Sequence, residues 1–171
     1  MLKTSLSKVL SEQVNAEYYS AYLYLAMSAY ADRAGFKGIS NWFFVQAKEE
    51  MAHGTNIYQH LLERGATPSF ADIKVPQTEF KSIEELFSKT LTHEQHVTEL
   101  INNIASIALR ENDHATYNFI LWYVNEQVEE EATADELLTK VRLIGDNTAL
   151  LYNLDTELAT RMFNNPFTAA E

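Results

Sequence analysis

Residues 43–61 read FFVQAKEEMAHGTNIYQHL, and this stretch decides the fold. Its apolar residues recur in steps of three and four, which is the spacing that places side chains on one face of an α-helix. Two polar residues, Glu50 and His53, fall on the same apolar face. The stretch therefore predicts a long helix that buries a carboxylate and an imidazole three residues apart.

Four long segments carry stripes of this kind, at about 5–33, 38–64, 82–112 and 114–144, and a shorter segment follows at about 146–163. None of these segments contains proline, and no alternation typical of β-strands is present. Ser82, Asp113 and either Asp146 or Asn147 precede three of the segments as predicted N-caps, and Gly65 and Gly145 are predicted helix stops. The pattern predicts an all-α protein.

The connections between these segments predict the topology. Short joints link the first helix to the second and the third to the fourth, which makes each pair antiparallel. The 16 residues from Ala66 to Lys81 separate the two pairs. Fully extended, they reach ~50 Å, and a helix of about 28 residues is ~42 Å long. We therefore expect a four-helix bundle with a long crossover between helices two and three, pinned by Ile73 and Val75.

Composition excludes several classes of protein. The net charge of −11, from 13 basic and 24 acidic residues, argues against nucleic-acid binding. The absence of cysteine excludes disulfides and thiolate metal sites and is compatible with a cytoplasmic location. No apolar run is long enough to span a membrane, and the first residues do not read as a signal peptide. We expect one cytoplasmic domain over residues 1–171, with a tail at 164–171.

One carboxylate interrupts each long stripe near the middle of its helix: Glu17, Glu50, Glu94 and Glu130. In a bundle of similar helices these four side chains meet at one level. Unpaired carboxylates in a core each cost several kcal/mol or have to take up a proton, so a bound cation is the simplest partner. His53 and Gln127 lie three residues from Glu50 and Glu130 on the same faces. Oxygen donors with one nitrogen favour iron or manganese.

Two further features leave alternatives open. Residues 93–96 read HEQH, but the two histidines stand three apart rather than four, which excludes the zinc-protease motif and leaves His93 and His96 as surface groups or neighbours of the site. Tyr24 lies two turns from Glu17 on one face, so it either serves the site through its hydroxyl, by hydrogen bonding or redox chemistry, or packs in the core.

From Met1 to about Phe163 the sequence resembles bacterial non-haem ferritins. The resemblance rests on Glu17, Tyr24, Glu94 and two motifs, EEMAH at 49–53 and EQVEE at 126–130. It implies a ferritin-like bundle with a short fifth helix, and an iron-storing ferroxidase that oxidises Fe²⁺ with O₂ or peroxide. In such proteins Glu50 bridges two irons, with Glu17 and His53 on one and Glu94 and Glu130 on the other.

The resemblance also implies details around the site. Gln127 shapes the place where oxygen binds, Tyr24 is the site tyrosine, and Trp122 is a nearby aromatic. A third iron site resembles a cluster of carboxylates at Glu49, Glu126, Glu129 and Glu130. Met51 matches the position of a haem ligand in bacterioferritins, but their second Glu-x-x-His on the fourth helix is missing, so we expect no haem.

The same resemblance implies a hollow homo-oligomer of 24 subunits. The fifth helix, Asn147 to Phe163, carries an apolar face that we expect to stay uncovered within one subunit and to pack at a four-fold junction. Its apolar residues are Leu150, Leu151, Leu154, Leu158 and Met162. Two readings from other classes remain: a bundle that holds a structural metal or performs a different di-iron oxidation, and a bundle with a purely structural role.

Overall fold

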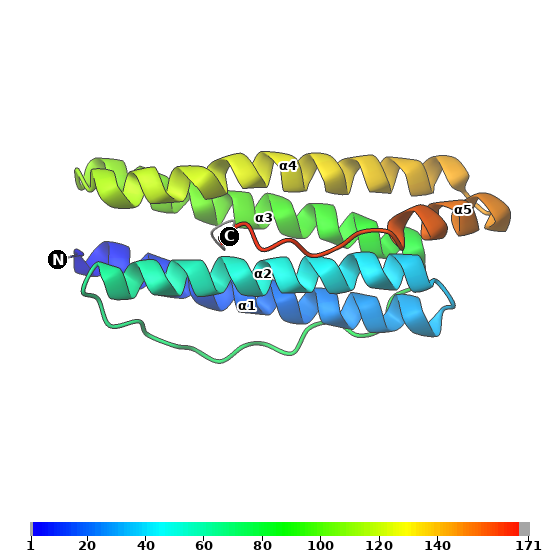
Figure 1. The fold of residues 1–171 in the computed structure, drawn as a ribbon, viewed down its shortest axis with the longest axis horizontal. Coiled ribbons are helices and arrows are strands. Elements are labelled where there is room, and N and C mark those ends of the chain that lie inside the picture. The colour runs from blue at the N-terminus through cyan, green and yellow to red at the C-terminus, as the bar shows by residue number, and fades with distance from the viewer. Residues whose placement is uncertain (1, 168–171) are drawn as a thin grey trace.

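The computed structural model describes residues 2–167, which form five helices and no strand. The helices are α1 (Thr4–Arg33), α2 (Lys37–Glu63), α3 (Ile83–Arg110), α4 (His114–Ile144) and α5 (Thr148–Leu158). Figure 1 shows α1 and α2 as one antiparallel pair and α3 and α4 as another, with the crossover running the length of the bundle. The predicted all-α bundle with one long crossover is confirmed. No helix in this described part combines the length and hydropathy needed to cross a membrane.

Side chains begin three of the helices as the sequence predicts. The Ser82 hydroxyl accepts from the Glu85 backbone N–H at 3.1 Å, and the Asp113 carboxylate accepts from the Thr116 N–H at 3.0 Å. Asn147, rather than Asp146, caps α5 through the Leu150 N–H. These contacts satisfy backbone donors that have no partner inside the helix, so they fix where each helix starts.

The crossover is held at points other than the predicted ones. Val75 is 87% exposed and Ile73 is 43% exposed, so the expectation that they pin the segment is wrong. Pro76 and Phe80 are buried instead, and the Phe80 ring packs edge-on against Tyr30 at 5.4 Å. Residues 71–75 are all exposed, so this part of the crossover is not held by its apolar side chains, and the burial falls on Pro76 and Phe80.

The apolar core is divided into two main parts. One cluster, around Phe43, Phe87 and Met27, fills the end of the bundle where α5 lies. A second cluster, around Ile57, Ile101 and Leu10, fills the opposite half. The stripe carboxylates lie between the two clusters in sequence on every helix, so a polar layer separates two apolar halves.

The apolar face of α5 is partly covered within its own subunit, which corrects the expectation that this face stays uncovered there. Leu154 and Leu158 are buried in the first core cluster, and Leu151 packs against it. Leu150 and Met162 stay exposed at 47% and 76%. The helix packs mainly against α2 and also touches α4 at this end of the bundle.

Helix α5 also caps α2. The residue before α2, Phe36, provides no side-chain cap, and the Asp155 carboxylate accepts from the Ile39 backbone N–H at 2.8 Å. A carboxylate at this place is favoured by the positive end of the helix dipole. Gly38 allows the close approach, because a Cβ there would lie 1.6 Å from the Asp155 carbonyl oxygen.

After α5 the chain turns back along the bundle, shown in red in Figure 1. The helix ends at Leu158 rather than near Phe163, because the Asn41 amide donates to the carbonyls of Leu158, Ala159 and Arg161. These carbonyl groups therefore have a hydrogen-bond donor without a further turn of helix. Of the predicted tail at 164–171, the last four residues lie outside the described ones.

The contact between Gly38 and α5 yields a prediction. Gly38→Ala is expected to lower stability by roughly 1–3 kcal/mol, because a methyl group has no room against the backbone of α5. Thermal unfolding and the rate of proteolysis within α5 measure the effect. Lys37→Ala is the matched control, since it removes only an exposed ion pair with Asp32, worth under about 1 kcal/mol. Equal melting temperatures and equal protease resistance for the two variants would contradict this packing.

Candidate metal centre

The four stripe carboxylates lie buried at one level of the bundle. Glu17 on α1, Glu50 on α2, Glu94 on α3 and Glu130 on α4 are 1%, 3%, 2% and 9% exposed. Their charges act on one another, since Glu50 is influenced by both Glu94 and Glu130. The structure therefore brings together the four carboxylates that the sequence places on separate helices.

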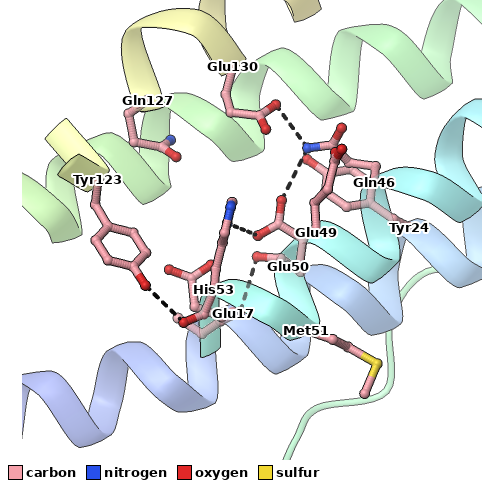
Figure 2. Close-up of polar contacts among 12 residues, drawn as sticks. Glu17, Tyr24, Gln46, Glu49, Glu50, Met51, His53, Tyr123, Gln127 and Glu130 are labelled. Atoms are coloured by element: carbon pink, nitrogen blue, oxygen red, sulfur yellow. Dashed lines mark hydrogen bonds and ion pairs between the residues drawn. The ribbon is translucent and has the colours of Figure 1, made fainter. Parts of the chain in front are cut away.

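Three of the predicted ligands form the tightest group. One atom each of Glu17, Glu50 and His53 lie within 4.8 Å of one another, close enough to hold a single metal ion. The His53 Nδ1 is 3.5 Å from the Glu50 Oε2. Figure 2 shows these side chains converging from α1 and α2. Nδ1 faces the carboxylate, and the buried Nε2 finds no hydrogen-bond partner among the described residues.

Two glutamines hold carboxylates of this layer in place. The Gln13 amide donates to Glu17 at 2.8 Å. The Gln46 amide donates to both Glu50, at 3.2 Å, and Glu130, at 2.8 Å, and so ties α2 to α4. Sequence reasoning missed both residues. Both could have been found from the spacing Gln-x-x-x-Glu, which occurs on each of the first two helices, because residues four apart lie on one helix face and can form a hydrogen bond.

Glu94 has two partners on the other side of the layer. The hydroxyl of the fully buried Tyr24 donates to its Oε1. The Gln127 amide nitrogen donates to its Oε2 at 3.2 Å and to its backbone carbonyl at 3.1 Å. Tyr24 therefore combines a packing role, stacked on Phe43, with a polar contact to the site. Gln127 turns a donor rather than an oxygen toward Glu94.

Burial dominates the electrostatics of the layer. It raises the pKa of Glu17 to about 8, and the neighbouring Glu50 adds to the rise. Burial, followed by the charge of a neighbouring carboxylate, raises the pKa of Glu130 to about 8, and burial raises the pKa of Glu94 to about 7. The pKa of Glu50 is also well above its usual range for these two reasons. Such carboxyls keep their protons near neutral pH until a cation replaces them.

A glycine lets α1 and α2 come close together at this level. A Cβ at Gly54 would lie 2.9 Å from the Tyr18 ring and 3.2 Å from the Glu17 Cβ. Glycine inside a helix costs about 1 kcal/mol relative to alanine. Gly54 therefore lowers the stability of α2 as a helix, but its missing side chain lets α1 approach α2 beside Glu17.

Three of the four predicted third-site residues lie closer to the surface than the buried layer. Glu49 and Glu126 are half-buried and Glu129 is exposed. Burial raises the pKa of both Glu49 and Glu126, and the charge of Arg161 opposes the rise at Glu49. Glu49 also forms an ion pair with Arg161, which sequence reasoning missed. Met51 points away from the carboxylates and is 53% exposed.

Two aromatic neighbours flank the layer. The Trp122 ring is 5.5 Å from the His53 ring. The His93 ring lies 5.9 Å from the rings of both Tyr19 and Tyr24 and is hydrogen-bonded to Ser20 at 2.7 Å. Of the two alternatives left open for these histidines, His93 is a neighbour of the site, and His96 is an exposed surface group.

The sequence and the fold match a known family. Residues 7–144 match the ferritin family profile, described as "Ferritin-like domain". The chain belongs to the ferritin family. The predicted family is confirmed, and the matched range covers the four-helix bundle except for the first three residues of α1.

Relatives and solved structures agree with this assignment. The chain is 43% identical to the bacterial non-heme ferritin of Staphylococcus haemolyticus and 41% identical to that of Staphylococcus aureus strain MRSA252, over 96% of this chain and 99% of each relative. An open pore ferritin from the archaeon Archaeoglobus fulgidus has a TM-score of 0.93 at 42% identity, over 95% of this chain and all of that one. An engineered closed form of the A. fulgidus ferritin has a TM-score of 0.94 at 43% identity, over 96% of this chain and all of that one.

The raised pKa values predict the pH dependence of metal binding. Below pH 7 the layer holds protons that a metal ion has to displace, so affinity for Zn²⁺ is expected to rise throughout the range from pH 6 to 8. At pH 6 binding should release roughly two or more protons per subunit. Calorimetry in buffers of different ionisation enthalpy measures this number. Glu17→Gln should lower it, and proton release near zero in the unmodified protein would contradict the assignment.

Proposed function

We propose that this ferritin oxidises Fe²⁺ at a pair of sites in the buried carboxylate layer and stores the Fe³⁺ as mineral inside a hollow shell. The family is commonly iron-oxidising, and the relatives above are named bacterial non-heme ferritins. We place this activity in the cytoplasm, whose reducing conditions suit a chain without cysteine.

One observation carries the proposal: four buried carboxylates and one imidazole face each other, and no lysine or arginine forms a direct ion pair with Glu17, Glu50, Glu94 or Glu130 in the described part of the chain. The donor set of oxygens with a single nitrogen fits iron. Glu17, Glu50 and His53 would hold one ion, as their spacing allows. Glu94 and Glu130 would hold the second, with Glu50 shared between the two.

This donor set favours oxidation for an electrostatic reason. Anionic oxygen ligands in a buried site stabilise Fe³⁺ more than Fe²⁺, because the higher charge gains more from them. The reduction potential of the iron therefore falls. Two Fe²⁺ ions side by side give one electron each to O₂, which takes up two protons and leaves as H₂O₂.

Neighbouring side chains keep the ligands in position. Gln13 and Gln46 donate to Glu17, Glu50 and Glu130 and so orient the carboxylates before an ion arrives. Burial and the nearby Glu94 raise the pKa of Tyr24 well above its usual range, so its hydroxyl stays protonated and donates to Glu94. We assign Tyr24 this positioning role.

Storage requires an enclosed space, and we propose a shell of 24 subunits, as the resemblance implies. Such a shell has a mass of about 470 kDa from chains of 19.5 kDa. At −11 for each chain its formal charge is −264, which draws Fe²⁺ toward it. We further propose that Glu49, Glu126, Glu129 and Glu130 take a third iron ion, held more weakly because Glu49, Glu126 and Glu129 are more exposed than the carboxylates of the buried layer.

The ligand assignment is tested by substitution. Glu50→Ala and His53→Ala are each expected to slow the fast phase of aerobic Fe²⁺ oxidation roughly 100-fold or more, because each removes a donor at the shared site. Stopped-flow absorbance of Fe³⁺ measures the rate. The native mass should stay that of the shell, since neither Glu50 nor His53 belongs to the apolar clusters that hold the four helices together.

His96→Ala is the matched control for His53→Ala, because the His96 side chain is 62% exposed and lies outside the layer. It should oxidise and store iron like the unmodified protein, which electron microscopy after aerobic loading should show as shells with dense cores. An unmodified rate in Glu50→Ala would overturn the ligand assignment, and a protein of monomeric mass without cores would overturn storage.

A further inference from the structure

The C-terminal segment, residues 159–167, reaches the metal layer of its own subunit. It leaves α5 and runs back toward the middle of the bundle (Figure 1). At its far end the Phe167 ring lies 6.0 Å from the His53 ring and 4.6 Å from the Trp122 ring. The segment therefore lies across the α2 and α4 surface that separates the buried layer from the outside.

Arg161 is the anchor of this segment. Its guanidinium forms an ion pair with the Glu49 carboxylate and donates to the Gln46 side-chain oxygen at 2.8 Å. It also lies over the Trp42 ring, 4.7 Å from the ring centre, and donates to the Trp42 carbonyl at 3.4 Å. The Arg161 and Glu49 side chains are only 25% and 18% exposed. Contacts on several sides thus fix the position of the charge.

Gln46 connects Arg161 to the buried carboxylates. Because the guanidinium takes the Gln46 oxygen, the amide nitrogen is left to face the layer, where it donates to Glu50 and Glu130. Glu130 is shared between the proposed second and third iron positions. One arginine therefore acts directly on Glu49 and, through Gln46, on Glu130.

Arg161 is also the basic side chain that pairs with the carboxylates of the proposed third iron position. Among the ion pairs between residues 2 and 167, only that of Arg161 involves Glu49, Glu126, Glu129 or Glu130. A guanidinium and a divalent cation on one carboxylate repel each other, and the repulsion is strong where water is partly excluded. The two cations cannot both use Glu49 without a cost in binding free energy.

We propose that Arg161 is a built-in competitor for the third iron position: it occupies Glu49, and a metal ion binds there only as the guanidinium withdraws. This inference rests on the proposed function. It makes the third position weaker than the carboxylates alone would make it, so an ion there is released more readily. It also couples metal binding to the C-terminal segment, since Arg161 holds that segment against α2.

Zn²⁺, which has no redox chemistry, tests the competition by calorimetry on the assembled apo protein. In the unmodified protein two ions per subunit are expected to bind tightly and a third weakly. Arg161→Ala should tighten the third ion roughly tenfold, equal to about 1.4 kcal/mol, and leave the first two within about twofold. Arg161→Lys keeps the positive charge, so it should restore a weak third position.

Arg142→Ala is the matched control, because it removes the same charge from an exposed pair with Glu84. It should leave all three affinities unchanged. In a Glu49→Gln background, Arg161→Ala should no longer strengthen the third ion. Circular dichroism and native mass establish that each variant is folded and assembled.

The outcomes separate the two proposals. A third affinity that is unchanged in Arg161→Ala, while two ions still bind tightly, would overturn the competition and leave the proposed function standing. An equal gain in Arg142→Ala would also overturn it, because general charge would then be the cause. Absence of the two tight ions in the unmodified protein would overturn the proposed function itself.

Discussion

The constraint on which the structure depends is the burial of four carboxylates at one level of the bundle, with one imidazole beside them and, in residues 2–167, no ion pair to a lysine or arginine. Glu17, Glu50, Glu94 and Glu130 are each at most 9% exposed, and burial raises the pKa of every one. Because native proteins are typically stable by only about 5–15 kcal/mol, such a layer is a considerable cost. It is maintained because the apolar clusters on either side hold the four helices in register.

Several local features hold the carboxylates of this layer in position. Gly54, unfavourable within its helix, allows α1 to approach α2 beside Glu17. Gln13 and Gln46 donate to carboxylates across the layer, and Tyr24 and Gln127 donate to Glu94. The donors stabilise the charged form of the carboxylates, whereas burial opposes it. The apo site is consequently ordered before an ion binds, which lowers the cost of arranging ligands around the ion.

The sequence alone predicted what depends on local periodicity. The stripes placed the four carboxylates on four helix faces, and Ser82 and Asp113 began their helices as expected. It failed where contacts join distant segments. Leu154 was expected to face another subunit but packs on its own core, and the ion pair between Glu49 and Arg161 links residues 112 apart. Helical spacing reports which residues share a face, but not which segment covers that face. The exposed Leu150 leaves a subunit contact near α5 as a prediction.

The most direct test of this account is anomalous X-ray diffraction from crystals of the assembled protein loaded with Fe²⁺ without oxygen. It locates metal ions independently of any rate or spectrum. The account predicts two strong anomalous peaks inside each subunit, one beside Glu17, Glu50 and His53 and the other between Glu50, Glu94 and Glu130. A buried layer without a peak, with iron only on surface carboxylates, would contradict the claim that these carboxylates are buried to bind metal.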